Sequence, residues 1–200
     1  MPIKFLANHN CLVVGPSQCG KTTFMLKVIE QKLVQPFPEQ IYYMYNVHQD
    51  FMDHHPEITF IKGLDFSKMD VTKSSLLVID DLLQEINEEV GKSFILGSHH
   101  YKISLFFLTQ SLFNNCRIYR LMSLNTHAFV LFRNQRNTRQ VATLARQCFT
   151  NSDVNRVLVA YKYESQRPRG FIILNFSPRI PKELVVIGDY WNKICPSVYL

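Results

Sequence analysis

Gly15-Pro-Ser-Gln-Cys-Gly-Lys-Thr22 directly follows the apolar run Cys11-Leu-Val-Val14. The segment fits the phosphate-loop pattern, in which a glycine and four arbitrary residues precede Gly-Lys-Thr. Glycines let backbone N–H groups turn inward around an oxyanion, and the positive end of a following helix points to the same place. We therefore predict a nucleotide phosphate site formed by Gly15, Pro16, Ser17, Gln18, Cys19, Gly20, Lys21, Thr22 and Thr23. In this pattern, Lys21 reaches the β- and γ-phosphates and the Thr22 hydroxyl binds Mg²⁺.

Apolar strands alternate with helices around this loop. Strands are predicted at 11–14, 41–45, 58–61, 75–79, 103–108 and 128–132, with a late strand at 170–176 at an edge or in a hairpin. Helices are predicted at 22–33, from about 84 to 96, and at 138–149. Because such alternation is typical of strands covered on both faces, the sequence predicts an α/β fold with a mostly parallel central sheet flanked by helices.

Length and composition favour one globular domain. The 200 residues suffice for a full core, and we expect a single domain over 1–200, with a C-terminal strand or tail extension from about 160. No apolar run reaches the roughly 18–20 residues of a membrane span, and the N-terminus lacks the apolar core of a signal peptide. The five cysteines show no metal-ligand spacing, so reduced thiols in an intracellular protein are the expectation.

Polar residues follow two of the buried strands. Asp80 ends the strand at 75–79, where a Walker B carboxylate for Mg²⁺ belongs, and Asp81 comes next. We predict that Asp81 activates the attacking water; Glu85 is an alternative base, and helix capping is an alternative role for Asp81. Gln110 follows the strand at 103–108, where its amide is predicted to sense the γ-phosphate.

Basic residues are concentrated in one block. The net charge is +6, and between 117 and 146 there are six arginines and no acidic residue. Arginine suits bidentate phosphate contact, so the block favours an anionic partner, with a solvated basic face as the alternative.

These motifs, in this order, resemble the FtsK–HerA superfamily of DNA-pumping ATPases. Further segments resemble the genome-packaging ATPases of polinton-like and adintovirus-like elements, which are relatives of the poxvirus-type packaging ATPase. The resemblance covers about residues 10 to 176 and is carried by Gly97-Ser-His-His100, Ile103-Ser104, Thr109-Gln-Ser-Leu-Phe113, Ser123-Leu-Asn125, Leu131-Phe-Arg-Asn134 and Ala142-Thr-Leu-Ala-Arg-Gln147.

The resemblance implies a P-loop NTPase of the ASCE, RecA-like type that moves double-stranded viral DNA into a capsid. It implies ATP and Mg²⁺ as ligands, a homo-oligomeric ring (pentamer or hexamer), and a capsid or portal vertex as partner. The setting would be a virus-infected host cell, in nucleus or cytoplasm, or the virion. A neighbouring subunit's arginine would complete each site; the candidates are Arg117, Arg120, Arg133 and Arg136.

Contact with DNA is expected to involve the phosphate backbone without sequence specificity. Lys62, Lys68 and Lys73 are candidate pore-loop residues, and His99 and His100 are expected to face DNA or end a helix rather than bind a metal. Two other functions stay open at this point: a small-molecule or nucleotide kinase, and a nucleotide-switch protein that assembles capsids or membranes.

Overall fold

The computed structural model describes residues 4–92, 94, 102–134, 138–188, 191 and 197–199. The strands are β1 (Phe5–Leu6), β2 (Asn10–Val14), β3 (Val34–Gln35), β4 (Gln40–Tyr45), β5 (Thr59–Lys62), β6 (Ser75–Asp80), β7 (Ile103–Thr109), β8 (Ala128–Phe132), β9 (Phe171–Asn175), β10 (Val186–Gly188) and β11 (Ser197–Val198). The α-helices are α1 (Lys21–Glu30), α3 (Arg117–Leu124), α4 (Thr138–Cys148) and α5 (Asn151–Glu164), and residues 88–92 and 94 are also helical. Short 3-10 helices are η1 (Asp50–His54), η2 (Phe66–Lys68), η3 (Leu83–Glu85) and η4 (Lys182–Leu184).

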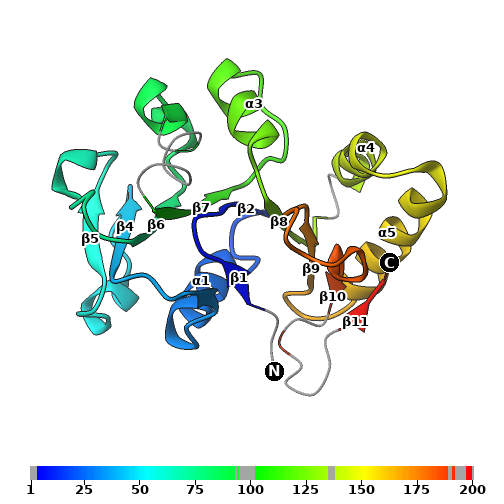
Figure 1. The fold of residues 1–200 in the computed structure, drawn as a ribbon, viewed down its shortest axis with the longest axis horizontal. Helices are drawn as coiled ribbons and strands as arrows, with labels where there is room; N and C mark the ends of the chain where they lie inside the picture. Colours follow the sequence, from blue (N-terminus) through cyan, green and yellow to red (C-terminus); the bar gives the residue numbers. More distant parts are fainter. Residues whose placement is uncertain are drawn as a thin grey trace.

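One large sheet organises the molecule (Figure 1). Its strand order is β11-β10-β9-β8-β2-β7-β6-β4-β5, and β1 pairs with β3 in a small separate sheet. Six neighbouring strands are parallel to one another: β8, β2, β7, β6, β4 and β5. In contrast, β9, β10 and β11 are antiparallel to their neighbours. The predicted late strand is confirmed as β9. Of the two predicted placements, the edge is wrong, because β9 lies between β8 and β10, whereas β9 does pair antiparallel with the next strand in the chain, β10.

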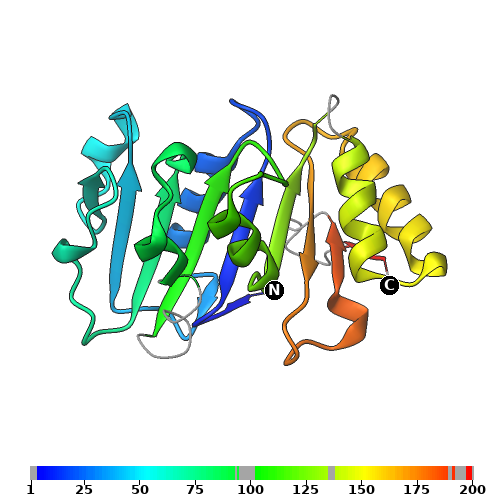
Figure 2. The same ribbon diagram turned by 90° about the horizontal axis from the view of Figure 1, so that it is seen from above.

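Both faces of the sheet are buried, as predicted. α1 and the β1–β3 pair cover one face, while the helical residues 88–92, α3 and α4 cover the other (Figure 1). Along β2 the side chains alternate between the two cores: Leu12 and Val14 face α3 and α4, and Cys11 and Val13 face α1. α4 and α5 lie together at the end of the sheet formed by β8, β9 and β10 (Figure 2). The fold class is therefore the α/β class that the sequence predicts.

Two predicted helices differ in their limits. α1 ends at Glu30 rather than Leu33, because Lys32 adopts a left-handed backbone with φ 50° and the chain then turns into β3. The predicted helix from about 84 begins instead at residue 88. Asn87 explains this start, because its Oδ1 accepts a hydrogen bond from the Val90 amide (3.1 Å) and so caps the helix.

Two helices were not predicted from the sequence. α3 follows Asn114, whose Oδ1 accepts from the Cys116 amide (2.8 Å), and α5 follows Thr150, whose hydroxyl donates to Asp153 (2.6 Å). Residue 160, where the predicted extension begins, lies within α5. Among the described residues, no helix is long and apolar enough to cross a membrane.

The parallel strands all end at the same edge of the sheet. At the end of β2, Val14 lies opposite Thr109 of β7 and Leu131 of β8. At the end of β6, Asp80 lies opposite Leu108 of β7 and Tyr45 of β4. This edge therefore collects the loop after β2 and the residues that follow β6, β7 and β8.

Candidate nucleotide-binding site

The phosphate loop connects β2 with the N-terminus of α1. The Gly15 amide donates to the Thr109 carbonyl (3.0 Å), which ties the start of the loop to the end of β7. A Cβ on Gly15 would lie 2.6 Å from both Cys19 Sγ and Phe132 Cβ, so only glycine fits between β8 and the loop. Gly20 has φ 108°, a left-handed conformation that favours glycine and that starts α1 with its amides pointing into the loop.

Lys21 lies at the centre of this loop. Its ammonium donates to the carbonyls of Gly15 (2.8 Å) and Pro16 (2.9 Å). The side chain thus folds over the loop instead of extending into solvent. This places a positive charge beside the backbone amides at the start of α1, where an anion is favoured.

Asp80 is held by residues from two other elements. Its side chain is 7% exposed, and it accepts a hydrogen bond from the Tyr43 hydroxyl of β4 (2.6 Å). The Thr22 side chain of α1 also lies near Asp80 and helps to lower its pKa. Burial raises the pKa of Asp80, while the Tyr43 hydrogen bond and the Lys21 charge oppose that rise. The sequence analysis did not identify Tyr43, which is fully buried and whose only signal was its place in an aromatic strand.

The donor set around Asp80 fits a magnesium ion. A threonine hydroxyl and a carboxylate are adjacent, and oxygen ligands are those that Mg²⁺ prefers, with water filling its other positions. Thr22 and Asp80 are thus the residues that would hold the ion. Elsewhere in the described ranges no group of three or more His, Cys, Asp or Glu residues is arranged to hold a metal.

Asp81 and Gln110 are brought together across β6 and β7. The Gln110 side-chain amide donates to Asp81 Oδ1 (3.2 Å), and both residues are exposed. Asp81 has φ 55°, which turns its carboxylate out of the strand direction. Glu85 lies elsewhere: its Oε2 would be 3.8 Å from a Cβ on Gly63, beyond the end of β5.

The four candidate arginines do not form one group. Arg117 and Arg120 are exposed on α3, whereas Arg133 directly follows β8 and donates its backbone amide to Gly170 (3.1 Å). Arg133 therefore lies beside its own chain's phosphate loop, since its neighbour Phe132 packs against Gly15. Arg136 lies outside the described residues, as do His99 and His100.

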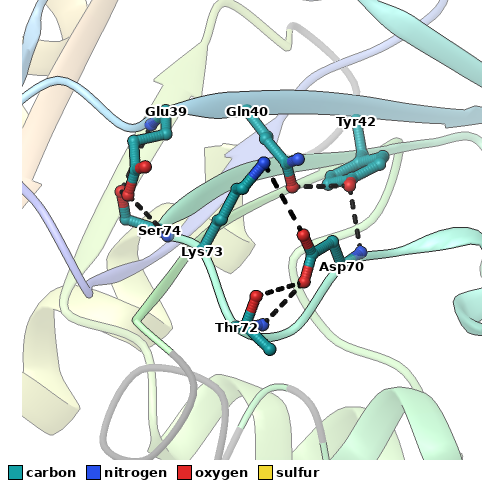
Figure 3. Close-up of polar contacts among 7 residues, drawn as sticks. All are labelled: Glu39, Gln40, Tyr42, Asp70, Thr72, Lys73 and Ser74. Atoms are coloured by element: carbon teal, nitrogen blue, oxygen red, sulfur yellow. Dashed lines mark hydrogen bonds and ion pairs between the residues drawn. The ribbon is translucent and has the colours of Figure 1, made fainter.

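The candidate pore-loop lysines differ in their surroundings. Lys68 pairs with Asp65 (3.5 Å) and Lys73 with Asp70 (3.8 Å). Figure 3 shows the second pair, in which Asp70 also accepts from the Thr72 hydroxyl and the Tyr42 hydroxyl accepts from the Asp70 backbone amide. Lys62 ends β5, at the same edge as the phosphate loop, and has no ion pair with any residue that the structure describes. Of the three lysines, Lys62 is thus the one whose charge is not offset locally.

A pocket of about 590 Å³ lies between α4, α5 and the residues that follow β8. It is lined by Arg133, Arg139, Leu158, Tyr161 and Lys162, among others. The Tyr161 hydroxyl donates to the Phe132 carbonyl (3.0 Å), which joins α5 to the end of β8. Arg169, in the turn after α5, was also missed by the sequence analysis; its side chain lies over Gly20.

The fold of this chain is shared with several solved structures, although the sequence matches no protein-family model and no curated protein. The DNA-packaging ATPase B204 of Sulfolobus turreted icosahedral virus has a TM-score of 0.57 and 12% identity, over 87% of this chain and 95% of that chain. The genome packaging NTPase B204 of Sulfolobus turreted icosahedral virus 2 in complex with sulfate has a TM-score of 0.54 and 11% identity, over 88% and 93% of the two chains. The same NTPase in complex with AMPPCP has a TM-score of 0.50 and 13% identity, over 88% and 94%. The chain therefore has the fold of a P-loop NTPase of the RecA-like type.

Proposed function

We propose that this chain is an ATP-hydrolysing motor that moves double-stranded DNA during viral genome packaging. The observation that carries the proposal is the meeting, at one sheet edge, of the phosphate loop, buried Asp80 and the Asp81–Gln110 pair. The likeness in fold to the B204 structures, whose names identify packaging NTPases, supports the viral part of the proposal.

Each residue of the site has a separate task in hydrolysis. The loop amides and the Lys21 ammonium bind the β- and γ-phosphates, and Thr22 and Asp80 hold a magnesium ion. When bound, that ion offsets the negative charge of the phosphates. Asp81 orients a water molecule and takes its proton as the water oxygen bonds to the γ-phosphorus. The bond from that phosphorus to the β,γ-bridging oxygen breaks, which leaves ADP and inorganic phosphate.

The hydrogen bond between Gln110 and Asp81 supports a sensing role for Gln110. The amide is bound to the carboxylate that we assign as the base, so a change at the γ-phosphate would reach β7 through this pair. The position of Glu85 beyond β5, beside Gly63, supports Asp81 as the base.

The finer parts of the proposal follow the resemblance to the FtsK–HerA and poxvirus-type packaging ATPases. We propose a homo-oligomeric ring of five or six subunits, with a neighbour's arginine completing each site and a capsid portal vertex as partner. The net charge of +6 supports contact with the DNA backbone without sequence specificity. The proposed setting is an infected host cell or the virion.

The test is ATP hydrolysis by the purified chain, with and without long double-stranded DNA, together with its mass in solution with ATP. We expect turnover that DNA stimulates and an assembly of five or six subunits. Turnover by a monomer that DNA does not stimulate would overturn the motor proposal. Phosphate transfer to a nucleoside would instead identify a kinase.

A further inference from the structure

We propose that Arg169 contacts the phosphate groups of a nucleotide bound to the phosphate loop of the same chain. The inference rests on the proposed function, because it requires a nucleotide at this loop. It adds a phosphate-binding residue that comes from the turn between α5 and β9, outside the loop and outside the arginine block.

The side chain of Arg169 lies over the last glycine of the loop. The three atoms nearest to a Cβ built on Gly20 would all belong to Arg169: Cδ at 3.3 Å, and Cβ and Cγ at 3.6 Å. The aliphatic part of the arginine therefore packs against the backbone at the start of α1. Because Gly20 directly precedes Lys21 and Thr22, this packing brings the side chain to the part of the loop that is assigned to phosphate binding.

The turn that carries Arg169 is anchored on both sides. The Arg167 guanidinium pairs with buried Glu164 (3.3 Å), and the Gly170 amide donates to the Arg167 carbonyl (3.0 Å). Gly170 fits only as glycine, since a Cβ there would lie 1.8 Å from the Glu164 carbonyl oxygen. Its own carbonyl accepts from the Arg133 amide (3.1 Å), which attaches the turn to the end of β8.

Arg169 itself has a left-handed backbone, with φ 55°. A non-glycine residue is uncommon in this conformation and persists where the surrounding structure holds it. Here the anchors at Glu164 and Gly170 hold it. The position of the side chain over Gly20 is thus set by the fold rather than by a flexible loop.

Within the part of the chain that the structure describes, no acidic side chain offsets the charge of Arg169. No ion pair or hydrogen bond joins its guanidinium to any residue in the described ranges, in contrast to Arg167 and Arg156, which pair with Glu164 and Asp153. A guanidinium is always charged and matches the geometry of phosphate oxygens. A cation beside a phosphate loop that pairs with no acidic side chain among the described residues therefore suits a polyphosphate ligand.

Direct binding of a fluorescent ATP analogue tests the inference. We expect Arg169→Gln to weaken binding by about tenfold, as for the loss of one charge-assisted contact, and Arg169→Lys to lose less because it keeps the charge. Arg179→Gln is the matched control, because Arg179 is also an exposed arginine but follows β9 at the opposite edge of the sheet. Binding by Arg169→Gln equal to that of wild type would overturn the inference.

The same measurement separates the inference from the proposed function. If wild type binds no nucleotide, the proposed function fails; if wild type binds and Arg169→Gln binds equally well, only the inference fails. Thermal unfolding of each variant checks that the fold is intact.

Mixed assemblies test whether Arg169 acts within its own chain. Lys21→Ala subunits lack a working site of their own but would present all their arginines to a neighbour. Mixing them with Arg169→Gln subunits, at an ATP concentration low enough for the weaker binding to limit turnover, is expected to give no recovery, because the Arg169→Gln site stays defective beside any neighbour. Recovery would show that Arg169 acts on the neighbouring subunit and would overturn the assignment to the same chain.

Discussion

The Tyr43 hydroxyl donates a 2.6 Å hydrogen bond to the carboxylate of Asp80, and Tyr43 is fully buried beneath it. Burial raises the pKa of Asp80, and this hydrogen bond lowers it again. Tyr43 therefore favours the ionised form of a buried carboxylate, which is the form that binds a magnesium ion. A residue of β4, which β7 and β6 separate from the strand before the phosphate loop, in this way supports the proposed metal site.

Tyr43→Phe is expected to weaken Mg²⁺-dependent nucleotide binding by about tenfold, since it removes a hydrogen bond to a charged group. The loss of binding on the acidic side, the acid limb of the pH profile, should also move to higher pH. The sign follows because the lost hydrogen bond lowered the Asp80 pKa; without it the carboxyl takes up its proton at higher pH. Titration of binding with Mg²⁺ at several pH values measures both effects. An unchanged acid limb would contradict this role of Tyr43.

Lys21→Ala is expected to abolish ATP binding and turnover while the fold stays intact. Among the described residues, the ammonium bonds only to the Gly15 and Pro16 carbonyls, so its loss should cost no more than about 1–2 kcal/mol of unfolding free energy. Nucleotide binding measures the expected loss of the site, and thermal unfolding of the same variant checks that the fold is intact. Retained turnover would refute the assignment of the phosphate loop.

Asp81→Asn is expected to keep ATP bound but to lower turnover at least about a hundredfold, because an amide cannot take the proton from water. Glu85→Gln is the matched control and should leave turnover unchanged, since Glu85 lies beside Gly63. A single-turnover assay with labelled ATP distinguishes binding from hydrolysis. If Glu85→Gln is the inactive variant, the base is Glu85.

Gly15→Ala is expected to displace the phosphate loop, because its Cβ would lie 2.6 Å from Phe132 Cβ and from Cys19 Sγ. Overpacking of this kind typically costs about 1–3 kcal/mol of stability. The thermal unfolding temperature and the affinity for nucleotide should both decrease. A variant with wild-type stability and binding would show that β8 and the loop do not pack as the structure has them.

Lys21→Ala subunits mixed with arginine variants should identify the residue that acts between subunits. We expect recovery of turnover with Arg117→Ala or Arg120→Ala, since both residues are exposed on α3. Arg133→Ala should not recover, because Arg133 lies beside its own phosphate loop. Arg136→Ala completes the series. If none of the four variants recovers, the proposed ring with shared sites would be contradicted.

The sequence by itself determined the parallel sheet, the phosphate loop and the residues at the strand ends. Each of these depends on local patterns: apolar runs such as Leu76–Ile79, glycine spacing after Val14, and polar residues after a strand. Parallel strands share one edge, so the meeting of Asp81 and Gln110 with the loop followed from these patterns.

Only the tertiary structure decided which distant side chains support that site. Tyr43 reaches Asp80 because β4 lies next to β6, and Arg169 reaches Gly20 because α5 returns the chain beside β8. Strand order and the path of the turn between α5 and β9 are set by packing of the whole chain, and no local pattern encodes them. The same reason explains why α3 and α5 were not predicted. Neither helix has a side-chain hydrogen bond at its N-cap, and both are held by buried residues in the core, Tyr119 and Met122 in α3 and Val154 and Val157 in α5.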